Sequence, residues 1–177
     1  MTKTELRRLI RQRKHAHTAI ELQRLSAASV EALCLMPEWQ SADTVLLYYS
    51  LPDEVDTHDL VRRTAAEGRT VLLPRVDGDD LTLHRYDGDG SLQSGAFNIL
   101  EPSGPLFTDL DAISLAVVPG MAFTHCGDRL GRGKGFYDHL LPRLTQAYKI
   151  GLCWPFQIVE QIPTDVHDQR MNAVVCG

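Results

Sequence analysis

The chain has 177 residues, of which 44% are hydrophobic and 23% are charged, and its net charge is −5. Such a length and composition suit one compact domain over 1–177 and exclude disordered, fibrous and membrane-spanning classes of protein. The acidic balance argues against broad binding to nucleic acid or membrane surfaces, and with no apolar signal-peptide segment we expect a cytoplasmic protein, as a monomer.

The N-terminal part is predicted to be helical from about residue 3 to residue 36. Leu6 and Ile10 recur at helical spacing, and a second helical pattern runs over 26–34. Proline lacks the amide hydrogen that a helix interior needs, so Pro37 is expected to end this region.

Five short apolar runs, rich in β-branched and aromatic residues, are predicted to be buried strands. They are residues 44–50, 70–74, 112–119, 148–154 and 172–176. Residues 56–68 are predicted to form a helix, with Asp56 as its N-cap and Gly68 as its stop signal. Residues 81–86 alternate with period two, which predicts a solvent-facing strand that adds to the sheet in the antiparallel direction.

The alternation of strands and helices predicts an α/β fold, with a largely parallel sheet that helices cover on both faces. Ligands of such sheets bind outside the carboxyl ends of the strands. We therefore expect the loops after residues 50, 119 and 154 to converge on a functional site.

The segment GDRLGRGKGFYD at 127–138 is a glycine-rich basic loop between a predicted strand and a short helical pattern. Glycines allow successive backbone N–H groups to turn inward around an anion, and the following helix start adds partial positive charge. The arginine and lysine side chains stay charged near neutral pH, so they suit holding a phosphate better than moving a proton. The segment lacks Walker A spacing. It is predicted to bind phosphate, the alternative being a solvated basic turn.

Asp138 follows the basic loop directly. A carboxylate there can hold Mg²⁺ against phosphate oxygens, or it can simply complement the dipole of the following helix. These two interpretations stay open on the residues alone.

Several ordered segments accompany this loop. They are KTELR at 3–7, PDEVDT at 52–57, FNILEP at 97–102, VVPGMAFTHCGDRLGRGKGFYD at 117–138, FQIVEQIP at 156–163 and HDQRMN at 167–172. In sequence and in order they resemble the 5-formyltetrahydrofolate cyclo-ligase family, also called 5,10-methenyltetrahydrofolate synthetases, over nearly the whole chain.

The resemblance implies a fold related to the sugar-phosphate isomerase and CoA-transferase group. It also implies an ATP-dependent, Mg²⁺-requiring reaction that converts 5-formyltetrahydrofolate to 5,10-methenyltetrahydrofolate and releases ADP and phosphate. In the family's mechanism the formyl oxygen attacks the γ-phosphate of ATP, N10 of the folate attacks the activated carbon, and phosphate leaves. Phosphoryl transfer of this kind depends on positioning and on neutralising charge, which a basic glycine loop provides.

The resemblance also implies roles for individual residues. The ATP-binding positions would be Lys3, Arg7, Arg129, Leu130, Gly131, Arg132, Gly133, Lys134, Gly135, Phe136 and Tyr137, with Arg132 and Lys134 acting in catalysis. The folate-binding positions would be Tyr49, Glu54, Phe97, Arg132 and Phe136, with the Glu54 carboxylate accepting two N–H bonds from the pterin. The magnesium carboxylates would be Asp138 and Asp168.

One position departs from the family's pattern, because Thr124 stands where an aspartate usually follows A-F. We therefore expect the loop to lose any hydrogen bonds that the aspartate would supply. The alternatives to the cyclo-ligase are an enzyme for another phosphorylated or CoA-linked substrate, a folate- or nucleotide-binding protein without turnover, and RNA binding through the basic first helix, which the acidic total disfavours.

Overall fold

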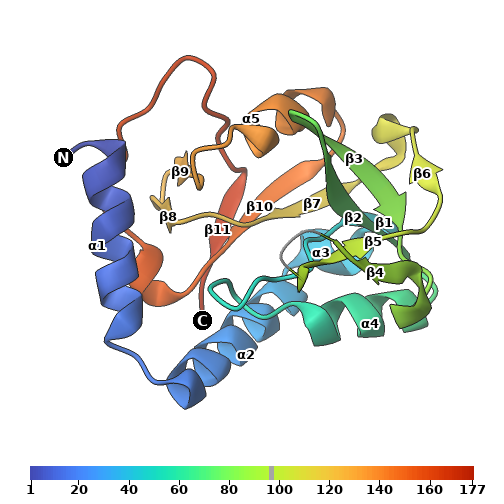
Figure 1. Ribbon diagram of the computed structural model, residues 1–177, viewed down its shortest axis with the longest axis horizontal. Coiled ribbons are helices and arrows are strands. Elements are labelled where there is room, and N and C mark those ends of the chain that lie inside the picture. Colours follow the sequence, from blue (N-terminus) through green and yellow to red (C-terminus); the bar gives the residue numbers. More distant parts are fainter. Residues whose placement is uncertain (96–97) are drawn as a thin grey trace.

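The computed structural model describes residues 1–95 and 98–177, and a mixed sheet lies at its centre (Figure 1). Within that part of the chain the sheet has seven strands, in the order β11-β10-β7-β1-β2-β3-β6. Their bounds are Thr44–Leu46 (β1), Thr70–Asp77 (β2), Asp80–Arg85 (β3), Leu106–Phe107 (β6), Leu115–Val118 (β7), Tyr148–Leu152 (β10) and Ala173–Val175 (β11). Five strands run parallel, whereas β3 and β6 add in the antiparallel direction at one edge. The predicted α/β fold is confirmed.

The helices differ from the prediction at the N-terminus. They are Lys3–His15 (α1), Ala19–Cys34 (α2), Pro37–Ser41 (α3), His58–Ala66 (α4) and Phe136–Leu140 (α5). The predicted helical region from about 3 to 36 is confirmed over most of its length, but it breaks after His15. Thr18 and Glu21 form a capping box that starts the second helix at Ala19, earlier than the pattern after Ser26 indicated. Pro37 begins α3 rather than ending a helix, since its fixed φ angle suits the first helical position.

The start of α4 also differs from the prediction. The N-cap residue is Thr57 rather than Asp56. Asp56 still stabilises the start of α4, because its Oδ1 accepts the backbone N–H of His58 at 3.0 Å. Gly68 ends the helical region with a φ of +84°, a conformation that glycine adopts without steric cost.

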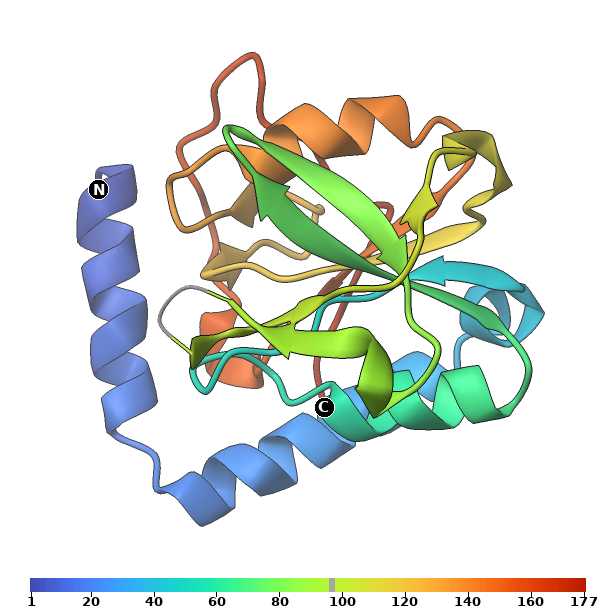
Figure 2. The same ribbon diagram turned by 45° about the vertical axis from the view of Figure 1, so that its right-hand side comes forward.

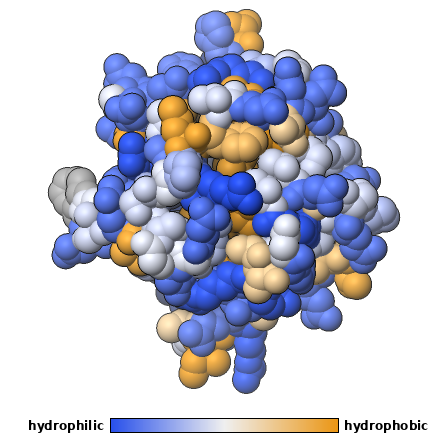
Figure 3. Space-filling model, turned by 90° about the vertical axis from the view of Figure 1, so that its right-hand side faces the viewer, coloured by the Kyte–Doolittle hydropathy of each residue, from blue (hydrophilic) through white to orange (hydrophobic). Residues whose placement is uncertain are grey.

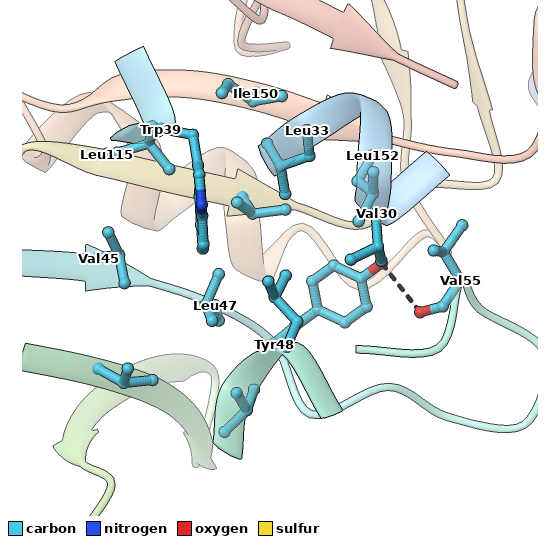
Figure 4. Packing of buried hydrophobic residues seen from close by; sticks show 14 of the residues in the cluster. Val30, Leu33, Trp39, Val45, Leu47, Tyr48, Val55, Leu115, Ile150 and Leu152 are labelled. Carbon is cyan, nitrogen blue, oxygen red and sulfur yellow. Dashed lines mark hydrogen bonds between the residues drawn. The ribbon is translucent and has the colours of Figure 1, made fainter. Parts of the chain in front are cut away.

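Successive residues of the central strands bury their side chains on opposite faces of the sheet. Val45 and Val71 belong to a cluster shared with α2, α3 and α4, and Figure 4 shows part of its packing around Tyr48. Leu46 and Leu72 belong to a second cluster, which includes Leu140 of α5. Figure 2 shows α2 and α4 on one side of the sheet and α5 on the other. Helices therefore cover both faces, as the apolar strands predicted.

Strand β1 ends earlier than predicted because a side chain takes over its backbone hydrogen bonds. The hydroxyl of Thr57 donates to the carbonyl of Tyr48 and accepts the N–H of Ser50 at 3.2 Å. These bonds turn the chain out of the sheet after Leu46, although the N–H of Leu47 still donates to Leu72. The loop that follows begins at the carboxyl end of the sheet.

The β2–β3 hairpin confirms the antiparallel addition but not its exposure. Gly78 forms the turn with a φ of +61°. Leu83, His84 and Tyr86 are buried, with His84 contacting the hydroxyl of Thr82 and the carbonyl of Gly104 at 2.9 Å each. Strand β6 pairs with β3, so this strand is covered rather than solvent-facing.

Short elements that the sequence did not predict complete the described fold. They are two hairpins, Leu92–Ser94 (β4) with Leu100–Pro102 (β5) and Ala122–Phe123 (β8) with Arg129–Leu130 (β9), and the 3₁₀ turns Asp89–Ser91 (η1), Leu110–Ala112 (η3), Leu141–Arg143 (η4) and Pro155–Gln157 (η5). The predicted strand 112–119 accordingly begins only at Leu115, after η3.

Helix α1 stands at one side of the sheet in Figure 2 and packs against the β8–β9 hairpin and the segment around η5. Leu6 and Ile10 of α1 are each 3% exposed and pack with Ala122 and Leu130 in a third apolar cluster. Their spacing of four residues places both side chains on one face of the helix. The helix is thereby held against the hairpin that leads into the glycine-rich loop.

The face of the protein shown in Figure 3 carries a mixture of hydrophilic and hydrophobic side chains. On the face shown in Figure 3, hydrophilic side chains predominate and hydrophobic ones form small groups between them. Scattered apolar side chains are normal on folded proteins. Over residues 1–95 and 98–177, no helix has both the length and the apolar composition needed to traverse a lipid bilayer.

Candidate functional site

A cavity of about 280 Å³ lies at the carboxyl ends of the parallel strands. Its wall includes the loop after β1, the Pro119–Gly120 turn after β7 and the glycine-rich loop after β9, and it is completed by residues 74–76 of β2, Leu81 of β3 and residues 99–101. The loop after residue 154 reaches the same region indirectly, because Gln157 donates to the carbonyl of Gly120 at 2.8 Å. The predicted convergence of loops is thus observed for two loops directly and for the third through one hydrogen bond.

The glycine-rich loop needs two of its glycines for their backbone angles. Gly133 has a φ of +103° and Gly135 has a φ of +74°, both in the left-handed region that side chains with a Cβ rarely adopt. Between them Lys134 is exposed and lines the cavity. The Nε of Arg7 in α1 donates to the carbonyl of Gly131 at 2.9 Å. Arg7, predicted to act near phosphate, therefore lies against the loop.

Arg129 is the buried cation of this site, with its side chain 4% exposed. It donates from Nη2 to Asp138 at 2.7 Å and from Nη1 to the carbonyl of Pro119 at 3.3 Å. Its guanidinium carbon lies 5.6 Å from the centre of the Tyr137 ring. The buried Nε has no hydrogen-bond partner among the described residues. Arg129 thus joins the β7 turn to the start of α5.

Lys3 and Asp168 come together although 165 residues separate them. The Nζ of Lys3 lies 2.7 Å from Asp168 and 2.6 Å from Asp165. Burial alone would lower the pKa of Lys3, but the hydrogen bonds to the two carboxylates raise it. Burial likewise opposes ionisation of Asp168, but the bonds from Lys3 and from the backbone N–H of Asp165, together with the nearby positive charges, lower the pKa of Asp168.

The two predicted magnesium carboxylates lie on the walls of different cavities. Asp138 lines the main cavity, Asp168 lines a neighbouring one, and Arg129 lines both. No group of three or more His, Cys, Asp or Glu side chains that could hold a metal ion occurs in the described part of the chain. Mg²⁺ in phosphate sites is commonly held by one or two carboxylates together with substrate oxygens, and each of these carboxylates has the oxygen chemistry of such a ligand.

Glu54 and Arg132 form a direct contact across the cavity. The Nε and Nη2 of Arg132 donate to Oε1 of Glu54 at 3.2 and 3.0 Å, while Oε2 accepts the N–H of Leu51 at 2.9 Å. The side chain of Glu54 is only 12% exposed. Burial raises the pKa of Glu54, although Leu51 and Arg132 act in the opposite direction. A residue of the predicted folate site and one of the predicted nucleotide loop therefore share a hydrogen-bond network.

Aromatic side chains supply the apolar part of the cavity wall. Tyr49, Phe136 and Tyr137 all line it. The ring of Tyr49 stacks on His58 at 3.9 Å between centroids with 12° between planes, which fixes its orientation. Phe97, predicted to contact folate, lies outside the described residues.

Comparison with known proteins identifies the family. The model of the 5-formyltetrahydrofolate cyclo-ligase family matches residues 1–177. The chain belongs to this family.

Named relatives agree with this family match. The 5-formyltetrahydrofolate cyclo-ligase of Escherichia coli is 30% identical over 175 residues, which cover 94% of this chain and 96% of that protein. A probable 5-formyltetrahydrofolate cyclo-ligase of Schizosaccharomyces pombe is 31% identical over 158 residues, covering 79% and 78%. The solved structure of Aquifex aeolicus 5,10-methenyltetrahydrofolate synthetase matches with a TM-score of 0.86 at 34% identity, covering 99% of this chain and 89% of that one.

Thr124, the departure from the cyclo-ligase pattern, does supply hydrogen bonds to the loop. Its hydroxyl accepts the N–H of Asp128 at 3.0 Å and donates to the carboxylate of Asp128 at 3.1 Å. The same carboxylate accepts from Arg170 at 2.7 Å. Thr124 thus supplies hydrogen bonds of its own, and together with Asp128 it closes the β8–β9 hairpin.

We predict that Thr124→Val destabilises the protein by about 1–2 kcal/mol, because the N–H of Asp128 loses a buried acceptor. Thr124→Asp should not raise turnover, since it sets a second carboxylate against that of Asp128. Thermal unfolding and steady-state rates check both variants. A strong rise in turnover for Thr124→Asp would show that the natural threonine is a handicap.

Three further residues that bind members of this candidate site were not predicted. Asp53 binds Arg132, Asp165 binds Lys3, and Gln157 holds the turn after β7. Asp53 and Gln157 stand within quoted motifs, PDEVDT and FQIVEQIP, but no sequence signal indicated their partners. Each makes a contact between segments that lie far apart in the chain.

Proposed function

We propose that this cyclo-ligase converts 5-formyltetrahydrofolate to 5,10-methenyltetrahydrofolate in the cavity beside β1 and β7, using ATP as co-substrate and Mg²⁺. One observation carries the proposal: the same cavity is lined by the buried carboxylate of Glu54 and by the basic glycine-rich loop. A reaction between a folate and a nucleotide needs both recognition groups within one cavity.

Glu54 would orient the folate. A carboxylate that accepts two N–H bonds matches the edge of an aminopyrimidine, and charge-assisted bonds of this kind are the stronger ones. In the free protein the N–H of Leu51 and the guanidinium of Arg132 offset part of the cost of burying this carboxylate. On folate binding, the N–H donors of the pterin would take over that function, while Tyr49 and Phe136 would pack against the ring.

The glycine-rich loop would hold the transferring phosphoryl group. Lys134 and Arg132 would neutralise the charge that grows on its oxygens as the formyl oxygen attacks. ADP would leave as the new oxygen–phosphorus bond forms. N10 would then attack the activated formyl carbon and close the ring, and phosphate would leave. Arg7 would fix the shape of this loop through the carbonyl of Gly131, and Arg129 would tie it to the turn after β7 through the carbonyl of Pro119.

Asp138 and Asp168 would hold Mg²⁺, which when bound supplies positive charge to the phosphate oxygens. Both carboxylates are ion-paired in the free protein, to Arg129 and Lys3. Those two cations would then keep the carboxylates oriented at the edge of the nucleotide site.

The test is a turnover assay in which purified protein, MgATP and 5-formyltetrahydrofolate are mixed and the strongly absorbing methenyl product is followed. We expect an absorbance rise that depends on ATP. Glu54→Gln tests the folate site. It should lower the affinity for the folate at least about tenfold, because one charged acceptor is removed. Folate binding without any absorbance rise would support a non-catalytic binding protein instead.

A further inference from the structure

Two carboxylates occupy two different edges of the Arg132 guanidinium. Asp53 binds the end of the group, with Nη1 to Oδ2 at 2.9 Å and Nη2 to Oδ1 at 2.6 Å. Glu54 binds the side, with one oxygen accepting from both Nε and Nη2. A guanidinium is planar and rigid, so a carboxylate on one edge fixes the direction of the other edge.

The two carboxylates are placed differently. Glu54 lines the cavity and is 12% exposed, whereas Asp53 is 42% exposed and is not among the described residues of the cavity wall. A ligand that enters the cavity can therefore compete for Glu54 while Asp53 keeps its hold on Arg132. Burial alone would raise the pKa of Asp53, but its bonds from Arg132 hold that pKa below the usual value.

We propose that Asp53 is a positioning residue that makes Arg132 couple the two substrates. The inference rests on the proposed function and deepens it. When the pterin takes the oxygen of Glu54, the Nε and Nη2 edge of Arg132 is released, and Asp53 keeps that edge directed into the cavity, where a phosphoryl oxygen can accept from it. Folate binding thus completes the nucleotide site.

Coupling of this kind is reciprocal, so each substrate strengthens the binding of the other by the same factor. Without Asp53, the nucleotide would have to order the released guanidinium itself. The entropy cost of that ordering would cancel the increase in affinity that folate binding brings. The positive charge of Arg132 would not by itself couple the two substrates. A guanidinium donates hydrogen bonds from two edges, so Arg132 can stay bound to Asp53 through one edge while the other edge binds a phosphate.

The experiment is calorimetry of a non-hydrolysable ATP analogue with Mg²⁺, with and without 5-formyltetrahydrofolate. We expect the analogue to bind the natural protein about fivefold or more tightly when the folate is present. We call the affinity for the analogue with folate, divided by that without folate, the affinity ratio. In Asp53→Asn this ratio should fall to about two or less, and Asp53→Glu should restore part of it. Arg132→Lys, which keeps the charge but has a single ammonium, should also lose the ratio.

Asp59→Asn is the matched control, because Asp59 binds Arg63 at 2.9 Å on the exposed side of α4. It should keep the ratio of the natural protein. An unchanged ratio in folded Asp53→Asn overturns the inference, and so does a natural protein that binds both ligands with a ratio near one. If the natural protein binds neither ligand, the proposed function fails together with this inference.

Discussion

Replacing Lys134 by alanine is expected to lower turnover by about a hundredfold to a thousandfold, which is the usual effect of removing one donor that stabilises transition-state charge. Lys134 is exposed, lines the cavity and stands between two glycines with left-handed backbone angles. The backbone of the loop therefore places the ammonium group at the cavity, and the side chain of Lys134 contributes little to packing. Steady-state rates with MgATP and 5-formyltetrahydrofolate measure the change.

Stability separates this prediction from a structural effect of Lys134→Ala. An exposed substitution of this kind should change the free energy of unfolding by less than about 0.5 kcal/mol. Arg143→Ala serves as the control, since Arg143 pairs with the exposed Asp80 at 3.2 Å. It should leave both rate and stability close to those of the natural protein. Equal rates for Lys134→Ala and the natural protein would remove Lys134 from the reaction.

Arg129→Leu is expected to destabilise the protein by about 3 kcal/mol, because it leaves the partly buried carboxylate of Asp138 without its cation. For a chain of this size that corresponds to a fall in Tm of about 6–12 °C. The variant should also lose turnover, since the β7 turn and the start of α5 are no longer joined. Thermal and urea unfolding measure the first effect.

A double variant tests whether the cost of Arg129→Leu comes from the unpaired charge. Arg129→Leu with Asp138→Leu should recover much of the lost stability, because replacing both members of a buried pair by apolar residues is often neutral. Arg63→Leu breaks only an exposed pair and should cost less than about 1 kcal/mol. If Arg129→Leu costs no more than Arg63→Leu, Asp138 is solvated well enough to need no partner.

The fold was predictable because its central strands are marked by continuous apolar runs. Val45 and Leu46 bury their side chains on opposite faces, and a strand covered on both faces has little use for polar residues. Element ends were less predictable, since local side-chain bonds decide them. The capping box of Thr18 and Glu21 starts α2, and the hydroxyl of Thr57 ends β1.

The site was predictable in its residue types but not in its pairings. Arg132 and Asp53 are 79 positions apart, and each by itself has the pattern of a solvated charge. The same is true of Lys3 and Asp168, which meet where α1 packs on the β8–β9 hairpin and on Ile162. Contacts of this kind depend on tertiary geometry, which no local pattern contains.

The packing of α1 has a consequence for the thermal behaviour of the enzyme. This helix carries Lys3 and Arg7, yet it is held by a small apolar cluster separate from the two that stabilise the sheet. Segments with few buried contacts open at a lower free energy than the core. On heating, α1 would detach before the sheet melts and would take its two cations away from Asp168 and Gly131, so the active fraction of molecules would fall while the fold persists.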